Sequence, residues 1–294
     1  RDALIALIDS VADTRCHFVG ERIEDEYRYV SALGKPSKEP VLAVRLERTE
    51  TWQGGVVAAA LHAADFCRVT WANPPNRIRK IRYVDENYSR KLFEVQEIDD
   101  TPAPPLPIPD CDVLAVCDFG HGAFTKQTMF NLCDFVGGRY LALAVQTNAA
   151  NSGFNLVTKW PAADYIVIDE PEARLAAQDR HGPIEAVMRR IAEHFPHLHR
   201  LIVTHGRHGA YGLQFGELYG QFHHCPAFTS TALDTMGAGD AFFAITAPIA
   251  EKMEATMPEL LMIGNAAGAL KTRILGHRKA INKHDLIDFI NSNA

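Results

Sequence analysis

The chain has 294 residues, enough for one large α/β domain or for one domain with a small accessory piece. Hydrophobic residues make up 47% of it and charged residues 22%, which is typical of globular proteins. The formal net charge of −6 gives no support to a nucleic-acid-binding surface. No apolar run approaches the roughly 18 residues that a membrane span needs, so we expect neither nucleic-acid nor membrane partners.

The cysteines and histidines do not predict a metal or disulfide framework. The six cysteines lack paired CxxC spacing, and several lie in apolar runs. We interpret them as small buried residues in a reducing compartment, and we expect a cytoplasmic protein. The thirteen histidines include clusters at residues 194–199 and 223–224, but no carboxylate or cysteine stands at ligand spacing from them. The absence of an initiator Met indicates a fragment, a processed chain or an unseen start.

The first third of the chain is predicted to be rich in β-strands. Residues 1–10 suit a short amphipathic helix and not a signal peptide. The pair Gly54-Gly55 precedes an Ala-rich helix, and such a pair lets the backbone approach a ligand closely. Period-2 alternation and apolar runs predict the other elements, in chain order: a core strand at 16–20, a β-rich region at 26–50 with a loop at 34–40, the helix at 56–66, a strand at 69–72, and two strands within 77–98.

After residue 109 the rhythm changes to strands alternating with helices. A stretch with five prolines, residues 101–109, is expected to be a stiff connector. The predicted strands lie at 113–117, 140–145, 165–168 and 201–204, and an antiparallel hairpin at 213–222. The predicted helices lie near 125–136, 171–179, 183–195, 240–252, 257–274 and 283–292. This order predicts a mainly parallel sheet covered by helices on both faces, a three-layer α/β/α domain over residues 1–294.

Ligands of open parallel sheets bind outside the carboxyl ends of the strands. Three predicted strands end there in polar or glycine-rich sequence, at residues 118–122, 169–172 and 204–209. Each segment alone is more often a helix cap or a simple turn. Together they would place carboxylates for Mg²⁺ beside backbone donors for phosphates.

The most informative stretch is Asp234-Thr-Met-Gly-Ala-Gly-Asp240, called the glycine turn below. Gly237, Ala238 and Gly239 are small enough for their N–H groups to converge on an anion at the start of an apolar helix. Asp240 would then be the base for a hydroxyl that attacks phosphate. Locally, a helix entry capped by Asp240 explains the same residues equally well.

The glycine turn resembles the C-terminal signature of the ribokinase-like PfkB carbohydrate kinases, and the other motifs follow in the family's order. The resemblance implies an ATP-dependent kinase that uses Mg²⁺ and phosphorylates a hydroxyl of a sugar or sugar phosphate. It implies a ribokinase-like fold with a small β-sheet lid, formed here by insertions at about 22–50 and 77–98. An exposed lid sheet would leave its edge strands unpaired, so we expect a homodimer formed through it.

The resemblance also assigns roles to individual residues. Asp240 would be the base, and Gly237, Ala238 and Gly239 would stabilise the transferring phosphoryl group. The other assignments are Thr204, Gly206, Gly209 and Asn265 for the nucleotide, Glu172 with Asp169 for Mg²⁺, and Asp25, Gly54 and Gly55, with Asn148 or Asn151, for the sugar.

Several motifs are similar to those of heptose-phosphate kinases. They are Asp25-Glu-Tyr27, residues 33–40 (Leu-Gly-Lys-x-x-Lys-Glu-Pro), Arg82-Tyr-Val-Asp85 and Arg90-Lys-Leu-Phe-Glu94. Those kinases are often fused to a nucleotidyltransferase domain that makes activated sugars for surface polysaccharides. Such a domain could be present in the full-length protein.

The chain departs from the family pattern near the sugar. Ala59 replaces an Asn, Asp169 replaces another Asn, Gln146 stands where Asp-Pro-Lys is usual, and His121 replaces a Lys. The segment between Phe66 and Ile81 is also short for the family. These departures leave the acceptor open. They also leave two alternatives: a nucleoside or fructose-phosphate kinase of the same fold, or a catalytically impaired binding or regulatory module.

Overall fold

A computed structural model describes residues 1–88, 90–137, 139–216, 220–228 and 232–293. Its helices are α1 (Asp2–Ser10), α2 (Val56–Ala63), α3 (Lys126–Val136), α4 (Glu170–Ala177), α5 (Ile184–Ala192), α6 (Ala238–Ala250), α7 (Met257–Lys271) and α8 (Lys283–Asn293), with single 3₁₀ turns at Val157–Lys159 and Gly206–His208. Its strands are β1 (Arg15–Gly20), β2 (Arg22–Gly34), β3 (Ala43–Gly55), β4 (Arg68–Ala72), β5 (Ile78–Asp85), β6 (Lys91–Ile98), β7 (Val113–Asp118), β8 (Tyr140–Val145), β9 (Tyr165–Asp169), β10 (Arg200–Thr204), β11 (Ala210–Gln214) and β12 (Gln221–Cys225).

Within these residues the larger sheet has eight strands in the order β12-β11-β10-β9-β8-β7-β1-β4. Its strands run parallel from β4 to β10, and β11 pairs antiparallel with both β10 and β12. The central strands β7 and β8 are buried along their whole length. Such continuous apolar runs are what a sheet covered on both faces requires.

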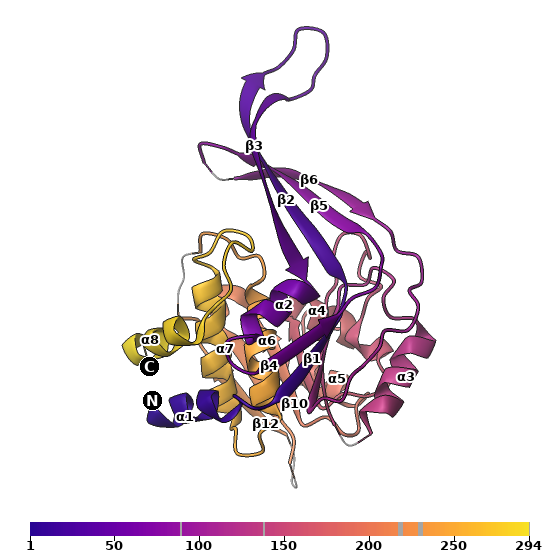
Figure 1. The fold of residues 1–294 in the computed structure, drawn as a ribbon, viewed down its shortest axis with the longest axis vertical. Helices are drawn as coiled ribbons and strands as arrows, with labels where there is room; N and C mark the ends of the chain where they lie inside the picture. The colour runs from indigo at the N-terminus through magenta and orange to yellow at the C-terminus, as the bar shows by residue number, and fades with distance from the viewer. Residues whose placement is uncertain (89, 138, 217–219, 229–231, 294) are drawn as a thin grey trace.

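Two hydrophobic cores lie on opposite faces of the larger sheet. One core joins the sheet to α1, α2, α6, α7 and α8, and the other joins it to α3, α4 and α5. Figure 1 shows these two helical layers flanking the strands. The chain is thus a three-layer α/β/α sandwich with a mainly parallel sheet, and the predicted fold class is confirmed.

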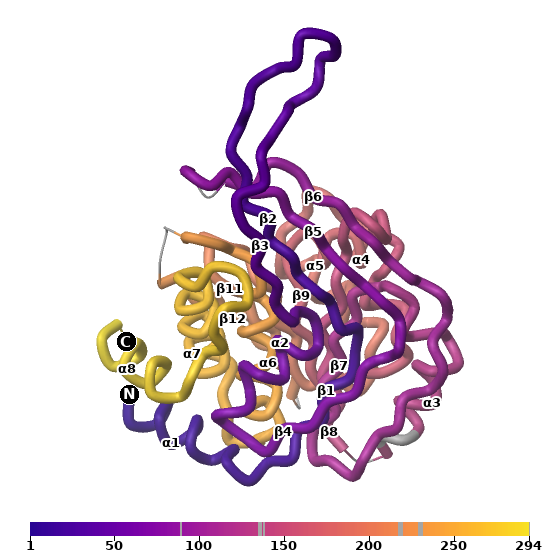
Figure 2. Tube along the Cα trace, turned by 45° about the horizontal axis from the view of Figure 1, so that its top comes forward, coloured from indigo at the N-terminus to yellow at the C-terminus, as the bar shows by residue number. Residues whose placement is uncertain are grey.

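A second sheet, the small sheet, contains four strands in the order β3-β2-β5-β6 in the described part of the chain. It rises from one end of the sandwich, and the β2–β3 hairpin projects well beyond the body (Figures 1 and 2). β2 follows β1 after the single residue Glu21, and β3 leads directly into α2. The small sheet is therefore anchored to the body at both of these junctions.

The helices and strands lie close to their predicted positions. β11 and β12 pair as the predicted antiparallel hairpin, and residues 217–219 between them lie outside the described residues. No helix in the described ranges is long and apolar enough to cross a bilayer.

Candidate active site

A cavity of about 860 Å³ lies where the carboxyl ends of the parallel strands meet the small sheet. This volume is typical of a site for a small molecule or nucleotide. The lining residues come from the small sheet, from the ends of β9 and β10, from the glycine turn and from α7. Segments far apart in the sequence thus face one space.

Residues 235–240 of the glycine turn line this cavity. α6 begins at Ala238, two residues earlier than the sequence predicts, so Gly239 and Asp240 lie in its first turn. Gly237 precedes the helix with φ of 72°, a conformation that glycine adopts without strain. The N–H groups of Gly239 and Asp240 have no acceptor among the described residues, whereas that of Ala238 donates to the carbonyl of Thr235 at 3.3 Å. The free donors at the helix start suit an anion.

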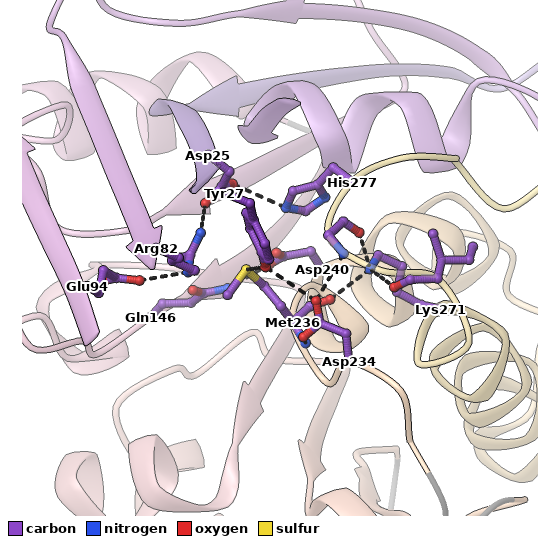
Figure 3. Close-up of polar contacts among 12 residues, drawn as sticks. Asp25, Tyr27, Arg82, Glu94, Gln146, Asp234, Met236, Asp240, Lys271 and His277 are labelled. Carbon is purple, nitrogen blue, oxygen red and sulfur yellow. Dashed lines mark hydrogen bonds and ion pairs between the residues drawn. The ribbon is translucent and has the colours of Figure 1, made fainter. Parts of the chain in front are cut away.

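Asp240 does not cap the helix. Its carboxylate lines the cavity, and Gln146 Nε2 donates to its Oδ1 at 2.6 Å (Figure 3). Burial raises the pKa of Asp240, while the charges of His277 and Lys271 and the Gln146 hydrogen bond oppose that shift. A carboxylate with a raised pKa is a better proton acceptor than an exposed one. The geometry therefore favours a base over a cap.

The residues predicted for the nucleotide line one end of the cavity. Thr204 ends β10, and Gly206 and Gly209 both have positive φ in the turn that follows. A side chain at Gly209 would collide with the carbonyl of Cys225. Asn265, on α7, donates to that same carbonyl at 2.9 Å, which ties α7 to the end of β12.

Asp169 and Glu172 form a capping box at the start of α4. The N–H of Glu172 donates to Asp169 Oδ1 at 2.8 Å, and the N–H of Asp169 donates to Glu172 Oε2 at 2.8 Å. The N–H of Thr147 donates to Glu172 Oε1 at 2.9 Å. Both carboxylates also line the cavity. Burial, with the charge of Asp169, raises the pKa of Glu172 to about 8. A bound cation would offset the repulsion between these two carboxylates and favour their ionised forms.

Two of the residues predicted for the sugar, Asp25 and Gly55, also line the cavity. Asp25 on β2 forms an ion pair with Arg82 on β5, and its Oδ2 lies 3.4 Å from Nε2 of His277. Burial disfavours the ionised form, but His277 and Arg82 outweigh it and lower the pKa of Asp25. A side chain at Gly54 would collide with the Asp25 carboxylate, and one at Gly55, where φ is 63°, with the backbone of Glu21. Both glycines are thus required by this close packing.

The sequence of the chain is similar to those of known proteins. Residues 147–283 match the family model of the pfkB family carbohydrate kinases. The resemblance predicted from the sequence is confirmed. The chain is 25% identical over 249 residues to "Bifunctional protein HldE" of Nitrobacter hamburgensis, an alignment that covers 79% of this chain and 44% of the relative. The chain thus spans less than half the length of that protein.

Solved structures show the ribokinase-like fold. The ribokinase of Thermotoga maritima superposes with a TM-score of 0.71 at 16% identity, over 95% of this chain and 99% of that one. An Arabidopsis thaliana ribokinase complexed with ribose and ATP gives 0.71 at 14% identity, with the same coverage. Phosphofructokinase-2 of Escherichia coli, in complex with substrates and products, gives 0.69 at 13% identity over 95% and 99%.

Two residues that the pfkB resemblance assigned to the sugar lie elsewhere. Asn148 and Asn151 do not line the cavity, and both side-chain amides donate to the carbonyl of Phe119, at 2.8 and 3.2 Å. Asn151 also donates to the carbonyl of Gln146 at 3.1 Å. These bonds fix the loop after β8, so in this structure the two asparagines hold the backbone of that loop and do not face the cavity.

From the sequence, no role in the site was assigned to three charged or polar side chains that line the cavity: Lys80, Arg82 and His277. Lys80 and Arg82 alternate on β5, so both side chains point to the same face of the small sheet. Lys80 has no hydrogen bond or ion pair with any described residue, and burial lowers its pKa. The alternation of β5 could have identified this pair, whereas His277 follows α7 in irregular sequence that carries no such signal.

Glu21 is a further buried carboxylate beside the cavity. Its oxygens accept from the N–H groups of Phe119 at 3.0 Å and His121 at 2.9 Å, which fixes the loop after β7. Burial and the charge of Asp118 raise the pKa of Glu21 to about 7. His121, where a Lys was expected, is buried and does not line the cavity. Glu21 therefore has a structural explanation and needs no catalytic one.

Proposed function

We propose that this protein is an ATP-dependent kinase that transfers the γ-phosphate to a hydroxyl of a sugar or sugar phosphate. The observation that carries the proposal lies at the start of α6: the Asp240 carboxylate and Gly239, whose N–H has no acceptor in the described part of the chain, line the same cavity. The acceptor would lie near Asp25 and the nucleotide near Thr204, at opposite ends of one cavity. The reacting groups would meet at the glycine turn.

In the proposed step, Asp240 takes the proton of the acceptor hydroxyl. That oxygen attacks the γ-phosphorus and forms a new O–P bond. The bond from the γ-phosphorus to the bridging oxygen of the β-phosphate breaks, and its electron pair leaves with ADP. The N–H groups of Gly239 and Asp240 stabilise the charge on the transferring phosphoryl group.

Mg²⁺ would be held by Glu172 with help from Asp169. The described residues contain no group of three or more His, Cys, Asp or Glu side chains arranged for a metal. Two carboxylates that face nucleotide phosphates suit Mg²⁺ all the same, because this ion keeps several waters and phosphate oxygens as ligands. The bound ion would neutralise charge between the phosphates.

The acceptor is proposed to carry an anionic group such as a phosphate. Lys80 is the basis for this choice, because its ammonium lines the cavity without a counter-ion bonded to it in the described structure. Arg82, in contrast, is already paired with Asp25 and with Glu94 at 2.7 Å. A phosphorylated sugar would give Lys80 a partner and is consistent with the resemblance to heptose-phosphate kinases.

The small sheet is proposed to act as a lid and to join two copies of the chain. β3 and β6 are its edges, and five apolar side chains on its strands are exposed: Leu33, Leu46, Leu92, Phe93 and Val95. Pairing of two such sheets would cover edges and apolar surface together. Light scattering tests this: Phe93→Glu should convert a dimer to a monomer, and a wild-type monomer would refute it.

We also propose a cytoplasmic location and a nucleotidyltransferase domain fused to this kinase in the full-length protein.

An ADP-release assay over a panel of sugars, sugar phosphates, nucleosides and fructose phosphates tests the activity. Asp240→Asn should lower turnover by roughly 10²–10⁴, the usual cost of losing a general base. Asp288→Asn, the same change on the exposed face of α8, is the control and should have no effect. A loss of less than about tenfold in Asp240→Asn would exclude Asp240 as the base.

The alternative of an impaired binding module has one observation in its favour. Gln146, which stands where the family has Asp-Pro-Lys, donates to one oxygen of Asp240. If the protein binds ATP but releases no ADP with any acceptor in the panel, this alternative replaces the kinase. Turnover with a nucleoside or fructose phosphate alone would instead select that class of kinase.

A further inference from the structure

A buried lysine lies directly beneath the glycine turn. Lys271, in the last turn of α7, has no exposed surface and does not line the cavity. Its Nζ donates to the carbonyls of Met236 and Gly276, both at 2.8 Å, and lies 3.5 Å from that of Ile274 (Figure 3). An ammonium has three donors and no acceptor, so a group of three carbonyls matches its charged form.

The carboxylate of Asp234 binds the other side of the same two peptide segments. Its Oδ2 accepts from the N–H of Gly276 at 2.9 Å, and its Oδ1 from the N–H of Met236 at 3.2 Å. Lys271 binds the carbonyls of these residues and Asp234 binds their N–H groups (Figure 3). One cation and one anion therefore brace the glycine turn against the loop after α7.

This brace controls the position of the catalytic groups. Met236 is followed by Gly237, which enters α6 and leads to Gly239 and Asp240. Gly237 packs on Lys271: a Cβ at this position would lie 3.3 Å from Lys271 Cε. The charge of Lys271 also favours the ionised form of Asp240. Burial lowers the pKa of Lys271, and the charges of Asp234 and Asp240 oppose that shift.

We propose that Lys271 is a built-in monovalent cation that holds the glycine turn in its working position. Clusters of backbone carbonyls are the ligands that replace the hydration shell of K⁺. Here the lysine ammonium already occupies such a cluster, so the protein needs no free K⁺ at this place. Lys271 is a positioning residue, because it does not face the substrate. The catalytic part of this inference rests on the proposed kinase function.

Two variants distinguish a cation site from simple packing. Lys271→Ala removes the ammonium and leaves space between the carbonyls, whereas Lys271→Met removes the charge but fills the space. Each protein is dialysed into tetramethylammonium, which is too large for the space, and K⁺ is then added. The readouts are the melting temperature and the kcat and KM for ADP release.

Wild type should show the same melting temperature in both salts and a kcat that changes by less than about twofold. Lys271→Ala should have a kcat at least about tenfold lower in tetramethylammonium, with the KM for ATP within threefold, since binding contacts are unchanged. K⁺ at about 100 mM, a concentration that would fill a weak cation site, should raise the melting temperature of Lys271→Ala by about 2 °C or more and restore much of its kcat. The melting temperature and kcat of Lys271→Met should not change when K⁺ is added. Lys279→Ala, which removes an exposed ammonium paired with Asp285, is the control and should behave as wild type.

Activation of the wild type by K⁺ would overturn the proposal, and so would a Lys271→Ala protein whose melting temperature and kcat ignore K⁺. If no acceptor supports turnover in any variant, the kinase function fails, while the melting series still decides whether the carbonyls form a cation site. If Lys271→Ala does not fold, the wild-type comparison decides alone: K⁺ dependence refutes the inference and independence supports it.

Discussion

Gly239→Ala should separate the stability of the glycine turn from its chemistry. Gly239 lies in the first turn of α6 and lines the cavity. A Cβ built on it meets no protein atom within 4 Å, and its φ is not positive. The protein itself therefore gives no reason for glycine at this position. In the proposed mechanism the reason is the phosphoryl group, which must approach the bare backbone here.

The two effects have opposite signs. Alanine should stabilise the free protein by about 0.5 kcal/mol, because it restricts the unfolded chain and suits a helix. In a protein of this size, that corresponds to a melting temperature about 1 °C higher. The same methyl group would displace the transferring phosphoryl by about 1 Å, and a displacement of that size can cost roughly 10² in kcat/KM.

Gly237→Ala is the matched comparison two residues earlier. Its φ of 72° disfavours alanine by about 1–2 kcal/mol. Its Cβ would also press on His277 Cε1 at 3.0 Å. This variant should therefore lose stability, which thermal melting would show, whereas Gly239→Ala should not. If Gly239→Ala keeps its kcat/KM within threefold, the phosphoryl group does not approach this backbone and the proposed site is wrong.

Three further predictions concern the charges around the cavity. Arg82→Met should reduce the free energy of unfolding in urea by about 3 kcal/mol, because it leaves the buried Asp25 carboxylate with His277 alone; a loss below about 1 kcal/mol would contradict this. The raised pKa of Glu172 means that the folded protein binds a proton more tightly than the unfolded chain, so stability should fall as pH rises from about 4.5 to about 8, and Glu172→Gln should flatten this slope in thermal melts. Lys80→Met should raise the KM for a phosphorylated acceptor at least about tenfold and that for ATP less, whereas equal effects on both would place Lys80 at the nucleotide.

The fold was largely predictable from the sequence because its signals are local. Continuous apolar strands such as Val113–Asp118, alternating with amphipathic segments, specify a parallel sheet with helices on both faces. The helix starts were less accurate. In the structure α6 begins at Ala238, earlier than predicted. The reason is that Gly237 adopts a left-handed conformation, which ends the preceding turn directly before the helix.

The cavity was predictable only where a motif marks it. Asp240 and the nucleotide-side glycines stand at strand ends and helix starts, which a sequence reveals. The alternation of β5 shows that Lys80 and Arg82 share one face of a strand, but it does not show that this face meets the cavity. His277 reaches the cavity through the loop after α7, whose placement no short-range pattern encodes. Asn148 stands after a strand end, where a polar side chain was expected to face a ligand. In the structure it donates a hydrogen bond to the backbone carbonyl of Phe119 instead.

In the proposed kinase, the way the small sheet joins the body would link substrate selection to the timing of the reaction. Asp25, Lys80 and Arg82 lie on β2 and β5, whereas Asp240 lies on α6 of the body. If the small sheet rotates about Glu21 and Gly55, these three side chains move as one unit. They then approach Asp240 only when the sheet closes over the cavity. An empty site would then keep the base away from its partners, and a water molecule could not easily take the place of the sugar. Wasteful hydrolysis of ATP would be suppressed by the same movement that admits the correct acceptor.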